Sequence, residues 1–423
     1  MYNQFDFNYY DKKIDREKYI VATFSFKAPK LTFTQAVHAI AGESSIGTWT
    51  KISGLSAAQY KKLAPKLIWK NEAKHMVSIA YPLALFELKN IPQLLSSIGG
   101  NVFSMKVVTQ LRLLDIEFPK VYIDSFLGPQ HGIVGIRKIL KIKKRPLIGS
   151  IVKPKVGLTA KEHAQAAYTL WKNGVDIVKD DENLTDLSFN RFKVRVKEVI
   201  KMRKQVEKET GQLKLAVINI TAPYNLALER AKYIKKMGGR CMMVDIVAMG
   251  WSAIQSLRQE NLGLIIHGHR AGHSMFTRNE EHGMTMYVVA KLARLAGIDQ
   301  LHTGTVVGKM DGTKTEVQKI DDFLKEDWLH FDNLQSDWSE IKPVMPIASG
   351  GLHPGLLPDV VKYIGQDVII NFGGGIFGHP DGVAAGAKAA SQAAQAVMNQ
   401  QTLEEFSQTH DELATALKFW VNN

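Results

Sequence analysis

Cysteine is almost absent from this sequence, whose 423 residues contain a single one, Cys241. A lone cysteine cannot form a disulfide within its own chain. It lies in the apolar run CMMVDIV (241–247), which predicts a buried strand residue in a reducing compartment. Low-complexity segments are also missing, so the chain is expected to fold along its whole length.

Long hydrophobic runs are missing as well. No apolar stretch approaches the length that a membrane-spanning helix needs, and the N-terminal MYNQFDFNYYDKK lacks the apolar core of a signal peptide. These absences predict a cytoplasmic protein with no membrane partner. The length and the 45% hydrophobic content allow a sizeable core in two or three domains.

Acidic residues are fewer than basic ones, 41 against 54, and the formal net charge is +13. Such an excess can indicate a nucleic-acid-binding protein. Here, however, the bases of 138–145 and 193–209 alternate with apolar residues, as on the solvated faces of amphipathic helices. Neither zinc-finger spacing nor an aromatic RNA-binding motif is present. We therefore expect no nucleic-acid partner, and an acidic small molecule would suit this charge.

From Leu147 onward, short β-rich apolar runs alternate with helical patterns. Continuous apolar strands separated by helices predict a parallel sheet covered on both faces, and about eight such units fit a closed (β/α)₈ TIM barrel. An open doubly wound sheet is the alternative, but no G-x-G-x-x-G follows the first strand. The candidate strands lie at 147–153, 175–181, 213–220, 241–247, 262–269, 300–305, 344–350 and 368–374.

The first part of the chain has a different pattern. Strands are expected at 19–26, 76–82 and 110–118, with helices at 32–42 and 91–99. We therefore predict an N-terminal α+β domain of the ferredoxin-like kind at 1–140. The barrel domain would then occupy 141–423 and close with C-terminal helices.

Polar and glycine-rich clusters follow at least six of the predicted barrel strands. Any one of them is more often a solvated turn than a site. Jointly they indicate one functional rim, because barrel enzymes place their chemistry at the carboxyl ends of the strands. The clusters are KPK (153–155), KDDE (179–182), HGHRAGH (267–273), HTGTVVGKMDG (302–312), SGG (349–351) and GGG (373–375).

The acidic cluster at the second strand raises the question of a metal. Val175–Val178 runs directly into Lys179 and three acids, which indicates either a solvated turn or a metal site. The glycine turns after strands seven and eight are typical phosphate sites of barrels, and Arg270 with His302 could hold a second phosphate. The predicted ligand is a doubly phosphorylated small molecule.

At this point the motifs match a known family. The combination of KDDEN with GTVVGK is highly specific for one family. Within that family, the short length and the segment DDENLTDLSFNRF are most like the archaeal-type form III branch. The chain resembles the large subunit of ribulose bisphosphate carboxylase/oxygenase, Rubisco, in stretches that follow one another in order: ESSIGTWT (43–50), GNVF (100–103), KPKVGL (153–158), KDDEN (179–183), HGHRAGH (267–273), HTGTVVGK (302–309), SGGLHP (349–354) and FGGGIFGHPDG (372–382).

The resemblance implies an answer to the question of the acidic cluster. In that family the lysine of KDDE is carbamylated by CO₂, which converts a cation into an anionic oxygen ligand. Lys179 would then join Asp181 and Glu182 as ligands of Mg²⁺, a hard ion that prefers oxygen donors. Asp180 alternates to the other face of the strand and is expected to be structural.

The resemblance also implies catalytic roles. Carbamylated Lys179 would take the C3 proton of ribulose bisphosphate, and Lys153 would act as acid and base at C2 with Lys155 tuning it. His269 would assist proton transfer during hydration. Lys309, paired with Glu43, would stabilise the new carboxylate. CO₂ and O₂ would compete for the same enediolate.

By the same resemblance, ten residues are expected to bind the substrate. One phosphate is assigned to Thr48, Trp49, Gly351, Gly373 and Gly374, the other to Arg270, His302 and Ser349, and the metal-bound substrate to Asn101, with Gly350 completing the glycine turn.

The expected assembly is a homodimer or an assembly of dimers without a small subunit, in which the N-terminal domain of one chain caps the barrel of the next. Four departures from the family pattern, Gly272, Ile46, Ser104 and Met310, leave loop kinetics and CO₂/O₂ discrimination open. The alternative function is a Rubisco-like enolase or isomerase of sulfur (methionine) salvage, which shares the fold and the metal site. That branch usually loses several carboxylation residues, whereas this chain retains them.

Overall fold

The computed structural model describes residues 14–47, 54–307, 313–326, 328–331 and 334–421. Its internal contacts separate two compact units. The first comprises Met1–Leu127, Gly272–Ala296 and Glu326–Ile341, and the second comprises Gly128–Ala271, Gly297–Lys325 and Lys342–Asn423. Within the described ranges, no helix has the length and apolar character needed to cross a membrane.

The first unit is built on a mostly antiparallel sheet with the strand order β10-β4-β1-β3-β2. The three expected strands form, and β1 lies in the middle with β3 and β4 antiparallel on either side. The edge strands β2 and β10 were not predicted. The strands are β1 (Tyr19–Lys27), β2 (Lys66–Asn71), β3 (Met76–Pro82), β4 (Gln110–Glu117) and β10 (Gly283–Met284).

Helices and one hairpin complete this unit. The helices are α1 (Phe33–Glu43), α2 (Ala57–Leu63), α3 (Ile91–Ile98), α4 (Lys120–Ile123), α10 (Ser274–Thr277) and α11 (Met286–Ala296), and the hairpin pairs β12 (Trp328–Phe331) with β13 (Leu334–Asp337). Short 3₁₀ turns are η1 (Arg16–Lys18), η2 (Leu83–Leu85) and η3 (Asn101–Ser104).

Helix α11 shows what a helical pattern alone cannot determine. The sequence predicts a helix at 282–297 between two barrel strands, and α11 forms there. It packs on β4 of the first unit, where buried Lys291 Nζ donates to Asp115 Oδ1 at 2.6 Å and to the Ile116 carbonyl at 2.8 Å. These contacts group the helix with the N-terminal sheet.

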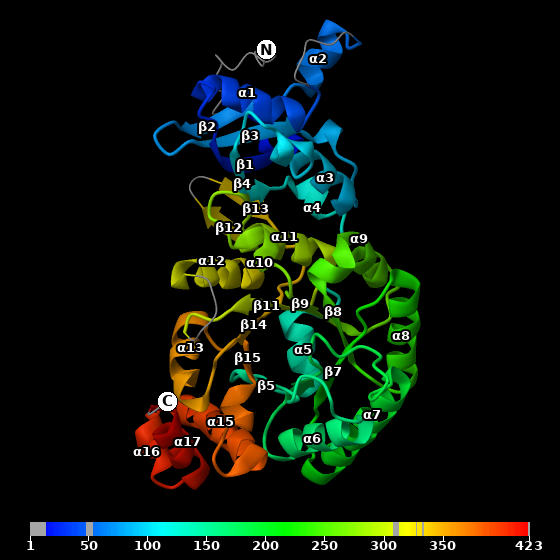
Figure 1. Cartoon of the computed structure of the whole chain (residues 1–423), viewed down its shortest axis with the longest axis vertical. Coiled ribbons are helices and arrows are strands. Elements are labelled where there is room, and N and C mark those ends of the chain that lie inside the picture. The colour runs from blue at the N-terminus through cyan, green and yellow to red at the C-terminus, as the bar shows by residue number, and fades with distance from the viewer. Residues whose placement is uncertain (1–13, 48–53, 308–312, 327, 332–333, 422–423) are drawn as a thin grey trace. The chain divides into compact units, whose positions relative to one another are not determined.

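The second unit is a closed barrel of eight parallel strands in the order β11-β14-β15-β5-β6-β7-β8-β9 (Figure 1). Each predicted strand forms within its expected range, so the (β/α)₈ prediction is confirmed and the open-sheet alternative is wrong. The strands are β5 (Leu147–Ile151), β6 (Ile177–Lys179), β7 (Leu215–Asn219), β8 (Cys241–Asp245), β9 (Ile265–His269), β11 (Gln300–Gly304), β14 (Met345–Ser349) and β15 (Ile369–Phe372).

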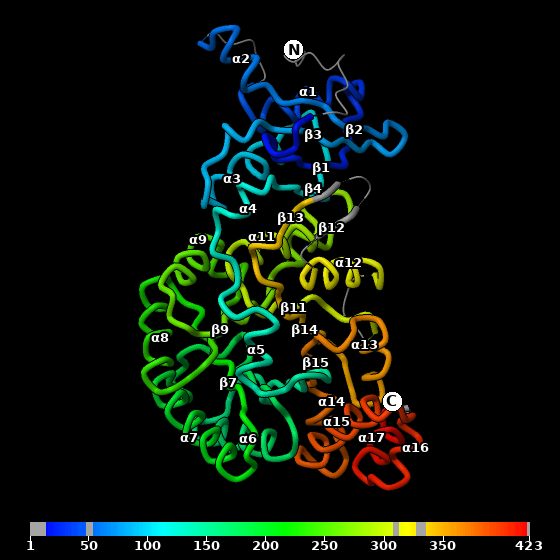
Figure 2. The backbone as a smooth tube through the Cα atoms, turned by 180° about the vertical axis from the view of Figure 1, so that it is seen from behind, coloured from blue at the N-terminus to red at the C-terminus, as the bar shows by residue number. Residues whose placement is uncertain are grey.

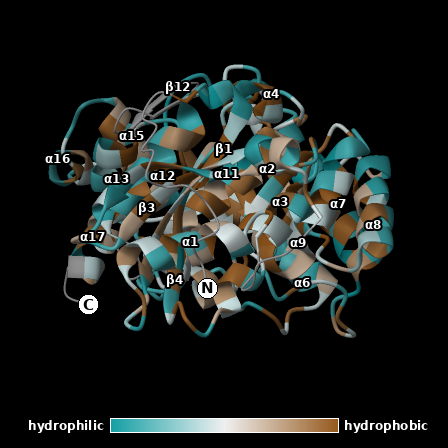
Figure 3. Cartoon of the chain, turned by 90° about the horizontal axis from the view of Figure 1, so that it is seen from above, coloured by the Kyte–Doolittle hydropathy of each residue, from teal (hydrophilic) through white to brown (hydrophobic). Residues whose placement is uncertain are grey.

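Helices surround this barrel, and those of its first half follow one another along one side (Figure 2). Figure 3 shows polar and apolar residues alternating along outer helices such as α8, as expected for helices with one face on the strands. The helices are α5 (Gly132–Leu140), α6 (Ala160–Lys172), α7 (Phe192–Thr210), α8 (Tyr224–Lys236), α9 (Ile246–Gln259), α12 (Lys314–Lys325), α13 (Leu357–Ile364), α14 (Gly374–Phe377), α15 (Gly382–Met398), α16 (Leu403–Ser407) and α17 (Asp411–Val421), with the 3₁₀ turn η4 (Pro354–Leu356).

Helix α5 closes the amino-terminal end of the barrel. Its apolar residues Ile133, Ile136 and Leu140 form one buried cluster with the first residue of seven barrel strands, Cys241 among them. Cys241 is fully buried, as predicted, and burial raises the pKa of its thiol. Since α5 packs against the amino ends of the strands, ligand chemistry is left to the carboxyl ends.

One buried acid in this unit lacks the partners that a charge needs. Asp321 on α12 is 0% exposed, and neither of its carboxylate oxygens has a hydrogen bond of normal geometry to any described residue. Burial raises its pKa to about 7, an effect that the nearby Thr303 hydroxyl and the charge of Lys325 offset only in part. The folded protein therefore holds this proton more tightly than the unfolded chain does.

We expect Asp321→Asn to stabilise the protein above neutral pH. Because the folded pKa lies above the unfolded one, this group contributes most to stability below about pH 4 and loses that contribution as the pH rises to about 7. The variant should gain on the order of 4 kcal/mol at pH 8 and little at pH 4. Urea unfolding at both pH values checks this, with exposed Asp322→Asn as the control. Equal stability differences at the two pH values would contradict it.

Candidate active site

The carboxyl ends of neighbouring barrel strands bring together most of the predicted residues. Lys179 is the last residue of β6 and His269 is the last residue of β9, while Lys153 and Lys155 follow β5. Asp181 and Glu182 begin the turn after β6. Contacts between these side chains join them into one cluster.

Lys179 lies at the centre of the cluster and is 2% exposed. Its Nζ donates to the Asp180 carbonyl at 2.8 Å and lies 3.9 Å from Glu182 Oε2. Burial lowers the pKa of this amine, although the charges of Glu182 and Asp181 oppose the shift. A lowered pKa increases the fraction of neutral amine, which is the form that attacks an electrophile such as CO₂.

The two predicted carboxylate ligands each face a lysine. Lys153 Nζ lies 2.8 Å from Asp181 Oδ2, and Lys155 Nζ lies 3.4 Å from Glu182 Oε1. Burial raises the pKa of Asp181, but the hydrogen bond and charge of Lys153 outweigh it and leave the pKa below its ordinary value. Asp181 is therefore ionised at neutral pH and attracts positive charge.

Asp180 faces away from this cluster, as the alternation along β6 predicts. Its Oδ2 accepts from Arg195 Nε and from the Asn219 amide, both at 3.0 Å, and its Oδ1 lies 3.0 Å from His163 Nε2. All of these groups are buried. The structural role predicted for Asp180 is confirmed.

His269 connects the acids to residues that sequence analysis did not single out. Its Nε2 lies 3.6 Å from Glu182 Oε2, and its Nδ1 lies 3.2 Å from Asp245 Oδ1, at the end of β8. Asn219, at the end of β7, donates through Nδ2 to the Glu182 carbonyl at 2.9 Å. Asp245 and Asn219 carried the signal of a polar residue that ends an apolar strand, which would have identified both.

The predicted phosphate residues of this end of the barrel form a second group: Arg270 follows β9, His302 lies within β11, and Ser349 is the last residue of β14. His302 Nδ1 lies 2.8 Å from Ser349 Oγ, and the His302 ring packs at 4.6 Å from the His269 ring. Arg270 donates through Nη1 to the Thr303 carbonyl at 2.9 Å. Burial lowers the pKa of Arg270 to about 10, so its guanidinium remains a cation at neutral pH.

The glycine turns lie at the same end of the barrel. Gly350 and Gly351 follow β14 with φ values of 118° and 74°, a backbone region that favours glycine. Gly373 and Gly374 follow β15, and a Cβ added at Gly373 would lie 3.6 Å from Lys153 Cε. The end of β15 is therefore adjacent to Lys153, which follows β5.

The remaining predicted residues lie elsewhere in the chain. Glu43 ends α1 and Asn101 begins η3, both in the first unit. Of the departures from the family pattern, Ser104 donates to the Asn101 carbonyl at 2.9 Å, Ile46 is half-buried, and Gly272 has a φ of 80°. Thr48, Trp49, Lys309 and Met310 lie outside the described residues.

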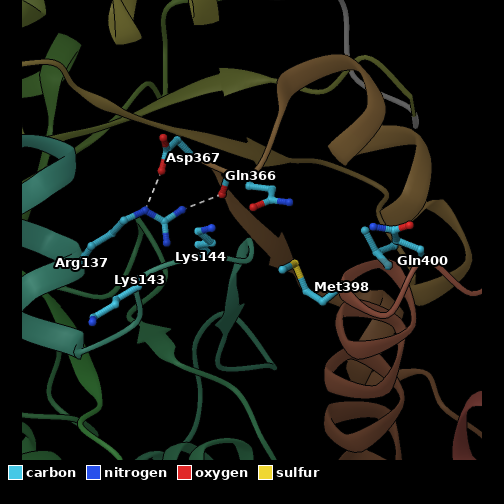
Figure 4. Close-up of a pocket in the computed structure, with 8 residues that line it drawn as sticks. Arg137, Lys143, Lys144, Gln366, Asp367, Met398 and Gln400 are labelled. Atoms are coloured by element: carbon cyan, nitrogen blue, oxygen red, sulfur yellow. Dashed lines mark hydrogen bonds and ion pairs between the residues drawn. The ribbon is translucent and has the colours of Figure 1, made fainter.

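A cavity of about 440 Å³ lies away from this cluster, beside the loop that follows α5 (Figure 4). Its basic lining includes Arg137, Lys143 and Lys144. All the N–H groups of Arg137 are already used, because it donates to Asp367 Oδ1 and to the carbonyls of Ile142, Arg145 and Gln366. Arg137 is therefore a structural clamp, and two surface lysines alone do not make an anion site.

The chemistry of the donor set suits a hard divalent cation. Among the described residues, no three His, Cys, Asp or Glu side chains gather in a way that could hold a metal. The expected set has two such ligands, Asp181 and Glu182, with modified Lys179 as the third. The two carboxylates already face the cationic nitrogens of Lys153 and Lys155, which shows that this position favours positive charge.

Comparison with known proteins agrees with this geometry. Residues 6–122 match the model of the ribulose bisphosphate carboxylase large chain, N-terminal domain, and residues 132–420 match the model of its catalytic domain. A ribulose bisphosphate carboxylase from Methanocaldococcus jannaschii is 47% identical over 392 residues, which are 90% of this chain and 92% of that protein.

Solved structures agree as well. A dimeric archaeal Rubisco from Hyperthermus butylicus superposes with a TM-score of 0.91 at 42% identity, covering 98% of both chains. An octameric Rubisco from Pyrococcus horikoshii OT3 gives a TM-score of 0.90 at 44% identity, covering 98% of this chain and 96% of that one. Both domains match in order and the relatives cover nearly the whole chain, so this chain belongs to the Rubisco large-chain family, as its motifs predicted.

Proposed function

We propose that this chain is a ribulose bisphosphate carboxylase. It would add CO₂ to the enediolate of ribulose bisphosphate, giving two phosphoglycerates, with O₂ addition as a side reaction. The observation that carries the proposal is the convergence of Lys153, Lys179, Asp181, Glu182 and His269 at one end of the barrel. The name of its archaeal relatives supports the same reaction.

Lys179 is proposed as the site of activation. Its Nζ would bond to the carbon of CO₂ and release a proton, giving a carbamate whose oxygen joins Asp181 and Glu182 as donors for Mg²⁺. Bound Mg²⁺ supplies Lewis-acid polarisation of the substrate carbonyl and hydroxyl. For Asp181 and Glu182 to bind the metal, Lys153 and Lys155 must leave these carboxylates and contact substrate oxygens instead.

The chain's own side chains would then move the protons. Lys179, in its carbamylated form, would take the proton from C3, and Lys153 would give and take protons at C2. His269, 3.6 Å from Glu182, would assist the hydration step. Glu43 and Lys309 would form the pair that meets the new carboxylate.

Two groups of residues would hold the phosphates. Arg270, His302 and Ser349 would bind one phosphate by charge-assisted hydrogen bonds. Thr48, Trp49 and backbone amides of the glycine turns, at Gly350, Gly351, Gly373 and Gly374, would bind the other. Asn101 would reach the substrate from the N-terminal domain.

Assembly, pathway and location belong to the same proposal. The domain division at 140/141 rests on the change of pattern along the sequence, and the cytoplasmic location rests on composition. A homodimer or assembly of dimers without a small subunit and a role in archaeal-type nucleotide or ribose salvage rest on the form III resemblance. The dimeric and octameric structures of its relatives support the assembly.

The decisive experiment is incubation of the purified protein with ribulose bisphosphate, Mg²⁺ and labelled bicarbonate. We expect labelled phosphoglycerate, and we expect it to appear faster after preincubation with CO₂ and Mg²⁺, because Lys179 must be modified first. Oxygen should compete with CO₂ and yield phosphoglycolate. No labelled product, together with turnover of a diketo substrate of sulfur salvage, would favour the enolase alternative.

A further inference from the structure

Four side chains form a hydrogen-bonded row in the barrel interior, which ends at the predicted phosphate-binding residues His302 and Ser349. Gln300 Oε1 lies 2.9 Å from His267 Nδ1, the two histidines meet Nε2 to Nε2 at 3.0 Å, and His302 Nδ1 lies 2.8 Å from Ser349 Oγ. Gln300 and His267 are register partners of the paired strands β11 and β9, which places their side chains together. Ser349 alone of the four is only half-buried.

At these donor–acceptor distances, each pair of neighbouring side chains in the row shares a single hydrogen. Two ring nitrogens that face each other at 3.0 Å share one N–H, so one ring donates and the other accepts. Both imidazoles are buried, and burial lowers their pKa well below the ordinary value, so each carries one N–H. The row therefore has one direction: all its members donate toward Ser349, or all donate toward Gln300.

The amide of Gln300 decides between the two directions. With Oε1 toward His267, its Nε2 is buried and has no hydrogen-bond partner in the described part of the chain. Turning the amide by 180° brings Nε2 next to His267 Nδ1 and moves Oε1 to the position that Nε2 occupied. The two orientations have nearly the same shape. An unpaired buried N–H is rarer in folded proteins than an under-satisfied carbonyl oxygen. The turned amide, which donates toward Ser349, is therefore favoured.

We propose that Gln300 and His267 are positioning residues that set the direction of the Ser349 hydroxyl. Gln300 Nε2 donates to His267 Nδ1, His267 Nε2–H donates to His302 Nε2, and His302 Nδ1–H donates to Ser349 Oγ. Ser349 then keeps its own hydrogen for an oxygen of the ligand.

The opposite direction would harm binding. Ser349 would donate its hydrogen inward to His302 and present only oxygen lone pairs to the ligand. An anionic ligand would be repelled by these lone pairs. The inference rests on the proposed function in one respect, namely that Ser349 contacts ribulose bisphosphate.

Neutron diffraction from crystals of the full chain exchanged into D₂O tests the direction without any assay. We expect deuterium on Nε2 of His267 and Nδ1 of His302, and a deuterated amide nitrogen of Gln300 facing His267. Deuterium on Nε2 of His302 would overturn the proposal.

Kinetics on ribulose bisphosphate test the consequence. Gln300→Met cannot donate, and Ser349→Ala removes the hydroxyl, so each should raise KM about tenfold, the size expected for one hydrogen bond to a charged group, while kcat changes little. If both act through the same hydrogen, the double variant should show no more than the larger single effect. Fully additive effects would overturn the proposal.

Gln392→Met on α15 is the matched control. Its amide donates to Glu412 Oε2 and accepts from the Leu413 backbone, so this variant loses a glutamine elsewhere in the same unit and should keep its KM. If the wild-type protein does not turn over ribulose bisphosphate, the proposed function fails while the neutron maps still decide the direction. If Gln300→Met does not fold, the neutron result decides alone.

Discussion

Lys179→Met is expected to reduce carboxylation about a thousandfold or more while the protein remains folded. The side chain is the proposed third metal ligand and the proposed base, and general bases alone contribute about 10²–10⁴-fold. Methionine fills nearly the same volume without an amine, so no cavity forms at this buried strand end. Labelled-bicarbonate assays measure the activity, and ¹³C NMR with ¹³CO₂ should show a carbamate signal in the wild type that the variant lacks.

A second buried lysine provides the matched control. Lys214 precedes β7 at the opposite end of the barrel, is 0% exposed, and donates through Nζ to the Val175 carbonyl at 2.9 Å. Burial lowers its pKa, as it does for Lys179. Lys214→Met should lower the melting temperature but leave kcat of the folded protein unchanged. Near-native carboxylation by Lys179→Met would defeat the assignment of Lys179.

Arg195→Leu is expected to cost about 3–5 kcal/mol of unfolding free energy, because it leaves a buried carboxylate without its charge partner. Arg195 is 0% exposed and ties Asp180 to the loop that follows β6, since it also donates to the Thr185 carbonyl at 2.7 Å and to the Asn190 carbonyl at 3.1 Å. Asp181 and Glu182 begin that loop, so activity should fall as well.

Urea unfolding at fixed protein concentration measures this effect. Arg191→Leu is the control, because Arg191 is 60% exposed and its ion pair with Asp186 at 3.1 Å lies at the surface. An exposed pair contributes about 0–1 kcal/mol. Equal losses in the two variants would show that the Asp180 network does not hold the loop.

Much of the fold and part of the candidate site could be predicted from the sequence. Each barrel strand is a continuous apolar run because both faces of a parallel barrel strand are covered, and this pattern is visible without a structure. The polar residues that end these runs, such as Lys179 and His269, had to meet at one rim because parallel strands end on the same side. The order of the motifs also identified the family correctly.

Which groups touch one another was decided only by the tertiary structure. Periodicity shows that a face of a helix is buried but not what covers it, so the packing of α5 under the barrel and of α11 on β4 could not be inferred. The edge strands β2 and β10 have weak patterns because most of their residues are not buried and β10 has only two residues.

The same limit applies within the site. The pairing of Lys153 with Asp181 joins residues 28 positions apart, and the contact of His267 with His302 joins residues 35 positions apart. Strand sequences determine which side chains face the interior. Closure of the barrel then determines their neighbours, because register and shear bring residues of different strands to one level.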